Sequence, residues 1–131
     1  MARKIQPHIL TAALAGLAVL LICSTFSAAS GAQDSSGKAL FEKRCGGCHA
    51  LDRDKEGPRL GGVYGRAAGR LASFQYSDAL KKSKVVWSDA TLERWLTDTE
   101  TVIPNNDMTF HVDKADERRE IIAYLKQSSG K

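Results

Sequence analysis

Cys45-Gly46-Gly47-Cys48-His49 is the stretch that decides the fold of this 131-residue chain. Its C-x-x-C-H spacing is the one at which a c-type haem is covalently attached. Cysteines three positions apart fall on the same side of a helical turn, so both thiols can form thioethers to the vinyl groups along one porphyrin edge. The adjacent His49 is then placed beside the iron, for which neutral imidazole is a good ligand. The motif predicts one covalently attached haem c with His49 as an axial ligand.

Two other kinds of site can use the same residues. A thioredoxin-like dithiol also has the C-x-x-C spacing, but it lies at a strand-to-helix junction, and no strand is predicted before Cys45. A structural zinc site needs four ligands, and Cys45, Cys48, His49 and His111 are enough in number. Because His49 adjoins Cys48, convergence of all four on one tetrahedral centre is awkward. The haem interpretation is therefore favoured over the thiol and zinc alternatives.

Residues 1–32 have the three-part layout of a secretory signal peptide, with basic residues, an apolar run over 9–23 and then small residues. Cleavage is predicted between Ala29 and Ala32, which leaves a domain of 33–131. The apolar stretch reaches about 20 residues when it is extended through Ala29, long enough for an uncleaved anchor. The sequence thus predicts export to the periplasm, with an inner-membrane anchor facing the periplasm as the alternative.

The charge balance argues against a nucleic-acid partner. The chain has a formal net charge of +4, and removal of the leader with Arg3 and Lys4 lowers it to +2. The remaining residues are enough for one small domain, which we expect to be a monomer. Membrane association is expected only if the leader is retained.

Apolar periodicity and capping residues predict a mainly α fold. A first helix is expected from Ser36 to the attachment turn, and short helices over 77–82 and 89–97. A last helix, capped by Asp113, carries an apolar patch near its end. The loop over 52–71 is rich in glycine, and a loop of that length is explained if it wraps a cofactor. The pattern predicts a small monohaem domain with about four to five short helices and long haem-wrapping loops.

The second axial ligand decides the function. Met108 is the only methionine left after the leader is removed, and it follows Ile103-Pro104-Asn105-Asn106 in a polar loop, where a methionine that only fills a core is unexpected. A thioether paired with histidine raises the reduction potential, as an electron carrier requires. His111 is the rival ligand. If Met108 is not a stable ligand, a haem-based peroxidase-like enzyme or a gas-binding sensor is the alternative function.

Several further motifs follow in a fixed order, and with them the chain resembles the class I c-type cytochromes, of the bacterial kind related to mitochondrial cytochrome c. The resemblance runs from about Gly37 to Lys126. Its motifs are Gly57-Pro58-x-Leu60-x-Gly62-Val63-Tyr64-Gly65-Arg66, Phe74-x-Tyr76-Ser77-x-Ala79, Trp87, Ile103-Pro104, Met108-x-Phe110 and Ile122-Ala123-Tyr124-Leu125-Lys126.

The resemblance implies a role for residues outside the attachment motif. It implies that the carbonyl of Pro58 accepts a hydrogen bond from His49 and so orients the imidazole. It implies that Phe110 covers the exposed haem edge on the methionine side. The resemblance also implies that three side chains donate hydrogen bonds to the haem propionates, namely Arg66, Tyr76 and Trp87. It further implies that the terminal helices contact each other through Gly37, Phe41 and Tyr124.

The same resemblance implies a one-electron carrier, not an enzyme, that docks transiently with redox partners. A membrane oxidase, a cytochrome bc1-type complex and a periplasmic dehydrogenase are the expected kinds of partner. Two residues depart from the family pattern near the methionine, because Trp95 replaces a common tyrosine and Leu80 replaces a common asparagine.

The lysine ring of the mitochondrial proteins is also thinned. Glu100, Thr101 and Asp107 stand at positions where that ring would have lysines, which suggests a less acidic partner. The basic residues that remain as possible steering charges are Lys43, Arg44, Arg70, Lys81, Lys82 and Lys114.

Overall fold

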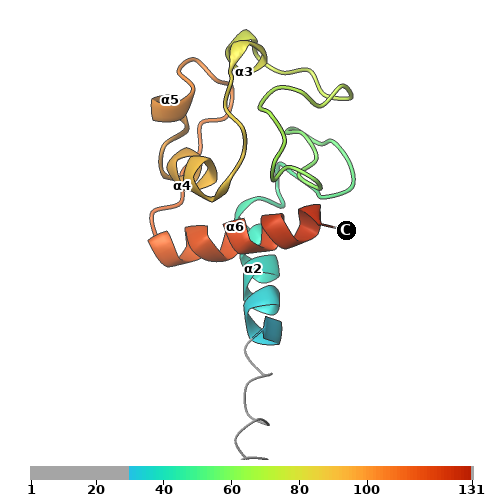
Figure 1. The fold of residues 1–131 in the computed structure, drawn as a ribbon, viewed down its shortest axis with the longest axis vertical. Coiled ribbons are helices and arrows are strands. Elements are labelled where there is room, and N and C mark those ends of the chain that lie inside the picture. The colour runs from blue at the N-terminus through green and yellow to red at the C-terminus, as the bar shows by residue number, and fades with distance from the viewer. Residues whose placement is uncertain (1–29, 131) are drawn as a thin grey trace, which may run out of the picture. The chain divides into compact units, whose positions relative to one another are not determined.

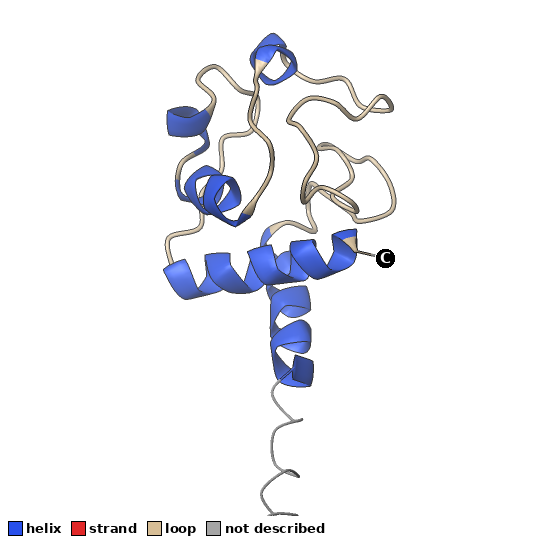
Figure 2. Cartoon of the chain, in the orientation of Figure 1, coloured by secondary structure: helices blue, strands red, loops and turns tan. Residues whose placement is uncertain are grey.

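The computed structural model describes residues 30–130, most of which belong to the compact unit that starts at Gln33. Helices and loops make up this range, and the structure assigns no strand within it, only an isolated antiparallel bridge between Ala67 and Val86. Figures 1 and 2 show this arrangement, which confirms the prediction of a mainly α fold with long loops. The helices are α2 (Ser30–Arg44), α3 (Asp78–Lys82), α4 (Asp89–Thr97), α5 (Thr99–Val102) and α6 (Ala115–Ser129).

The predicted leader lies outside the described residues, apart from the first residues of α2. Among the helices of residues 30–130, none is both long enough and apolar enough to cross a membrane.

The start of α2 differs from the sequence prediction. The helix begins at Ser30 rather than after Ser36, so the prediction of Ser36 as its N-cap was wrong. The residues between these two positions include the good helix formers Ala32 and Gln33 and no proline, so nothing interrupts the backbone ladder. The helix ends at Arg44, and the chain turns at once into the attachment motif, where the N–H groups of Cys48 and His49 both donate to the carbonyl of Cys45.

The terminal helices α2 and α6 cross at Gly37 (Figure 1). A Cβ atom at Gly37 would lie 2.5 Å from the carbonyl oxygen of Glu120 and 2.9 Å from the Cβ of Tyr124. One turn further along, the rings of Phe41 and Tyr124 are 5.5 Å apart between centroids. Arg44 then pairs with Glu117 at 2.7 Å. The contact that the family resemblance implied between the terminal helices is therefore present.

The two short central helices have the predicted bounds within one residue. The Ser77 hydroxyl accepts from the backbone of Leu80 at the start of α3. At the start of α4, Ser88 and Thr91 form a reciprocal capping box, in which each side chain accepts from the other residue's N–H. The helix α5 was not predicted. It follows α4 directly, with Asp98 between them as its N-cap.

The predicted cap of the last helix was wrong. Lys114, not Asp113, is the N-cap of α6, and its side chain makes no capping hydrogen bond. The guanidinium of Arg118 instead reaches back from the first turn and donates to the carbonyls of Val112 and Asp113. The Asp113 carboxylate lies 3.4 Å from the ring nitrogen of His111. The helix ends at Ser129, with Gly130 as its C-cap.

The core lies between α4, α6 and the turn after α2. Its largest fully buried side chains are Ile121 on α6 and Val112 in the preceding loop. The indole rings of Trp87 and Trp95 pack against each other at a tilt of 59°, with their centroids 5.2 Å apart. This packing positions α4 and α6 beside the attachment turn, where both helices line one cavity.

The crossing of the terminal helices predicts a large cost for Gly37→Ala. The added methyl group collides with backbone on α6 that cannot move without shifting the helix, so we expect a loss of about 1–3 kcal/mol in the free energy of unfolding. Denaturant unfolding of the purified protein measures it. Gly130→Ala is the matched control, because a Cβ there meets no atom closer than 3.8 Å, and its expected change is within about 0.5 kcal/mol. Equal stabilities of the two variants would contradict the close crossing.

Candidate haem-binding site

The functional site is a cavity of about 540 Å³ enclosed by the attachment turn, the long loops and the inner faces of α4 and α6. Its volume is within the usual range for cofactor sites. All of the residues predicted to contact the cofactor line it, although they are spread over more than sixty positions of the sequence. These residues are Cys45, Cys48, His49, Pro58, Arg66, Tyr76, Trp87, Met108 and Phe110.

His49 is held in the form that binds a metal. The side chain is 8% exposed, and its Nδ1 donates a hydrogen bond to the carbonyl of Pro58 at 2.7 Å. Burial lowers the pKa of His49, against the opposing effect of the Pro58 carbonyl, and the nearby charge of Lys55 lowers it further. The imidazole is thus neutral at pH 7, and with its proton on Nδ1 the lone pair is on Nε2.

Gly57 lets the backbone pass close to this imidazole. A Cβ atom at Gly57 would collide with the His49 ring. The loop is also tied back to the motif, because the N–H of Gly57 donates to the carbonyl of Cys48 at 2.9 Å. The hydrogen bond between Pro58 and His49 that the resemblance implied is therefore present. The adjacent backbone bond between Gly57 and Cys48 holds the two segments together.

The two cysteines differ in their surroundings. Cys45 is buried and Cys48 is exposed. Burial raises the pKa of the Cys45 thiol to about 11, although the charge of Arg44 acts in the opposite direction. Reactive dithiols have thiols of lowered pKa, so the environment of Cys45 does not favour the thiol oxidoreductase alternative.

The zinc alternative lacks a complete ligand set in the described part of the chain. No group of three or more histidine, cysteine, aspartate or glutamate side chains there is arranged to hold a metal ion. The ring of His111 is exposed, lies beside Asp113 and does not line the cavity. Its position disfavours His111 both as a zinc ligand and as the rival axial ligand to Met108.

Met108 is half-buried at the cavity, and side chains that the sequence reasoning missed hold its backbone. Its N–H donates to Oδ1 of Asn106 at 2.8 Å, and its carbonyl accepts from the hydroxyl of Thr99 at 2.6 Å. The Asn106 contact is a local turn typical of asparagine, which a reading of the loop could have found. The Thr99 contact joins two segments nine residues apart, and no sequence signal marks it. Trp95 and Leu80, the two departures from the family pattern, also line the cavity.

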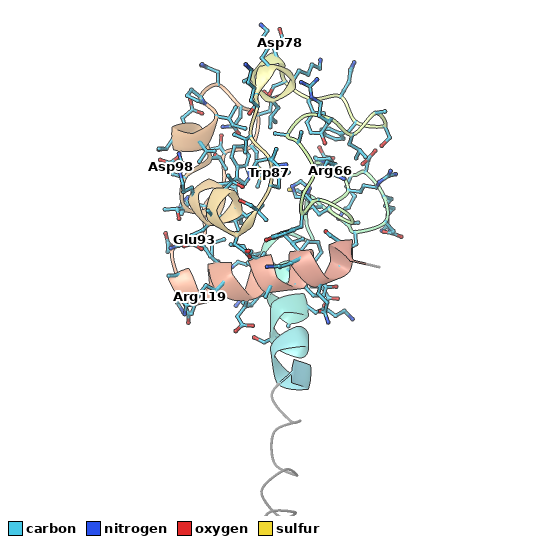
Figure 3. The ribbon with its side chains drawn as sticks, viewed as in Figure 1. Arg66, Asp78, Trp87, Glu93, Asp98 and Arg119 are labelled. Carbon is cyan, nitrogen blue, oxygen red and sulfur yellow. The ribbon has the colours of Figure 1, made fainter. Side chains whose placement is uncertain are left out.

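Three potential hydrogen-bond donors lie along one wall. The segments of Arg66 and Trp87 run side by side, because the N–H of Trp87 donates to the carbonyl of Arg66 at 3.0 Å (Figure 3). The Arg66 guanidinium donates to the carbonyl of Arg59 at 3.0 Å. Burial raises the pKa of Tyr76, and the positive charge of Arg66 acts against that rise. This wall therefore offers a cation, an indole and a phenol to an acidic group in the cavity.

The chemistry of the lining fits a covalently attached haem. Two thiols, a neutral imidazole and a thioether are present, which are the groups needed for attachment and for axial ligation. Most of the remaining wall is apolar, as a porphyrin face requires. The apolar side chains on α4 and α6 are Leu92, Trp95, Leu96, Ile121 and Leu125.

The fold and this lining define a small helical protein built around one covalently bound haem. The cytochrome c family model matches residues 35–129. Cytochrome c from Chlamydomonas reinhardtii is 38% identical over 110 residues, which cover 81% of this chain and 98% of the relative. Cytochrome c from Theileria parva is 41% identical over 101 residues, covering 74% and 87%. The solved structure of cytochrome cH from Methylobacterium extorquens is 35% identical with a TM-score of 0.67, covering 72% of this chain and 97% of that one.

The chain belongs to the cytochrome c family. It binds one haem c covalently, and it is a monohaem electron carrier rather than an enzyme. As a redox carrier it docks with partner proteins. The family and the carrier function predicted from the sequence are confirmed.

Proposed function

We propose that this cytochrome is an exported one-electron carrier of a respiratory or other periplasmic chain, in which His49 and Met108 are the axial ligands. Cys45 and Cys48 form the thioether attachments. The observation that supports this assignment is the convergence of both thiols, the imidazole and the only methionine thioether of the mature domain on one cavity.

The bound haem supplies a reversible one-electron couple at its iron. The residues around the haem set its reduction potential. The Pro58 carbonyl, by accepting from Nδ1, makes the His49 imidazole a stronger donor. The thioether of Met108 favours the reduced state and so raises the potential. The apolar walls from α4 and α6 exclude water, which limits the rearrangement that accompanies a change in charge.

We assign the haem propionates to the wall formed by Arg66, Tyr76 and Trp87. A buried carboxylate is costly without hydrogen-bond donors, and these side chains provide donors of three kinds in one place. Charge-assisted hydrogen bonds from the Arg66 guanidinium are the strongest available there. Phe110 lines the cavity beside Met108, where its ring shields the methionine side.

The assignment of Met108 predicts the behaviour of Met108→Ala. Loss of the thioether should lower the reduction potential by on the order of 100 mV, because axial ligands span a range of about 0.8 V. The reduced variant should also bind carbon monoxide, which the unmodified protein should not. Voltammetry and visible spectra measure both effects. His111→Ala is the control, and a change in that variant together with an unchanged Met108→Ala would move the ligand role to His111.

This experiment also separates the carrier from the alternative function. A peroxidase-like enzyme or a gas sensor needs a vacant or easily vacated sixth position. In the structure the backbone of Met108 is held by two side-chain hydrogen bonds, which supports a retained ligand. A ready shift of the unmodified protein with carbon monoxide would favour the sensor instead.

We further propose that this cytochrome docks through the rim of the haem cavity. This docking face is nearly neutral, so it fits a redox partner whose own docking face is not strongly acidic. The charged and exposed residues that line the cavity are Lys43, Arg44, Glu56 and Asp107. Two are basic and two are acidic, and Arg44 is already paired with Glu117 at 2.7 Å. Long-range steering depends on the net field of the docking face. A membrane oxidase, a cytochrome bc1-type complex or a periplasmic dehydrogenase with such a face would be a suitable partner.

The charge of this rim can be tested with small oxidants. Asp107→Lys should speed oxidation of the reduced protein by an anionic metal complex about two- to fivefold at low salt, because it replaces a negative charge beside the cavity with a positive one, a net change of +2. The gain should vanish at high salt. Asp116→Lys, which makes the same charge change on α6 away from the cavity, should have a smaller effect. Equal gains in stopped-flow rates would show that only the net charge of the protein matters.

Export rests on the signal-like layout of residues 1–32, with 33–131 as the mature domain. Protein recovered from the periplasmic fraction should have the mass of a chain cleaved between Ala29 and Ala32 plus one haem. Intact-protein mass spectrometry measures this directly. A full-length mass recovered from the membrane fraction would instead establish the retained anchor.

A further inference from the structure

The helix α5 has a buried polar residue at its first position. Thr99 is 3% exposed, and a buried hydroxyl is costly unless it is hydrogen-bonded. Its Oγ1 donates to the carbonyl oxygen of Met108 at 2.6 Å. A threonine on a four-residue helix is thus used to hold the backbone of the proposed ligand.

The other polar group of the Met108 backbone is held as well. Its N–H donates to Oδ1 of Asn106 at 2.8 Å. The amide nitrogen of Asn106 donates in turn to the carbonyl of Ile103 at 2.9 Å and to Glu100 at 3.3 Å. The N–H and the carbonyl of Met108 are therefore both hydrogen-bonded to side chains. The N–H is held by Asn106 in the same loop, and the carbonyl is held by Thr99 on α5.

The helix α5 is itself fixed in place. The Asp98 carboxylate, labelled in Figure 3, accepts from the N–H groups of Glu100 and Thr101. Glu100 reaches across and accepts from the N–H of Asn105 at 2.8 Å. Asn105 has a φ of 60°, a left-handed conformation that asparagine tolerates better than most residues. The loop and α5 therefore form one hydrogen-bonded unit that is packed against α4.

We propose that Thr99 and Asn106 are positioning residues that clamp Met108 at the cavity and keep its thioether available as the axial ligand. The proposal rests on the assignment of Met108 as that ligand. A residue fixed at both of its peptide groups has lost conformational freedom before it binds, which favours the bound state. Removal of one bond should raise the population in which Met108 has left, and an external ligand that needs the vacated position binds in proportion to that population.

Thr99→Val tests the clamp, because it removes the hydroxyl and keeps the branched shape. Azide titration of the oxidised protein is the main readout. We expect azide to bind about three- to tenfold more tightly, the factor that corresponds to the net loss of one hydrogen bond of about 0.7–1.4 kcal/mol. Visible absorbance of the methionine-ligated oxidised state should fall in parallel. Thr99→Ser, which restores the hydroxyl, should return both values toward those of the unmodified protein.

Thr101→Val is the matched control on the same helix. The hydroxyl of Thr101 donates to Asp98 at 2.7 Å and makes no bond to Met108. The variant should lose some thermal stability and leave azide affinity unchanged. The proposal is overturned if Thr101→Val and Thr99→Val tighten azide binding equally, since the effect would then be general loosening of α5.

Two further variants keep the result interpretable. Asn106→Ala removes the second bond and should also tighten azide binding, and it tests the clamp independently if Thr99→Val does not fold. Met108→Ala should bind azide at least as tightly as any of these. If Met108→Ala leaves azide affinity unchanged, the ligand assignment fails. If it binds azide tightly while both clamp variants behave like the unmodified protein, only the clamp is wrong.

Discussion

The crossing of α2 and α6 at Gly37 is the constraint on which the site depends. The helices touch backbone to backbone, so the position of α2 along α6 has almost no freedom. The attachment turn follows α2 directly, and α6 contributes Ile121 and Leu125 to the wall of the cavity. One close contact thus fixes where the macrocycle is tethered relative to the apolar surface that covers it.

The long loops are ordered because their backbone groups pair with one another. After the attachment turn the chain runs beside its own continuation, and the N–H groups of Leu60 and Gly61 donate to the carbonyls of Ala50 and Leu51. Further on, Gly65 and Trp87 are joined in the same way at 2.7 Å. Buried backbone groups must find partners in the absence of regular structure. These pairings let irregular segments line a cofactor cavity that short helices alone could not enclose.

The cofactor, its attachment residues and the extents of α3 and α4 could be predicted from the sequence, because each depends on local spacing or a local cap. The cap at Asp113 was wrong because α6 begins one residue later than expected, with Lys114 as its N-cap, and the Asp113 carboxylate lies beside the His111 ring instead. The helix α5 was missed because four residues are too few to show a period. The bond from Thr99 to Met108 was missed for a related reason, since it depends on how that helix packs.

The two proposed axial ligands are held by different means. His49 is fixed by the cysteine next to it in the chain and by the Pro58 carbonyl, and no substitution of a side chain removes that carbonyl. Met108 is held by the side chains of Thr99 and Asn106, which a single substitution can remove. The histidine side of the haem is therefore determined by the attachment motif and the backbone. The methionine side can be tuned by mutation without altering the attachment, so potential and ligand retention can change within one unchanged fold.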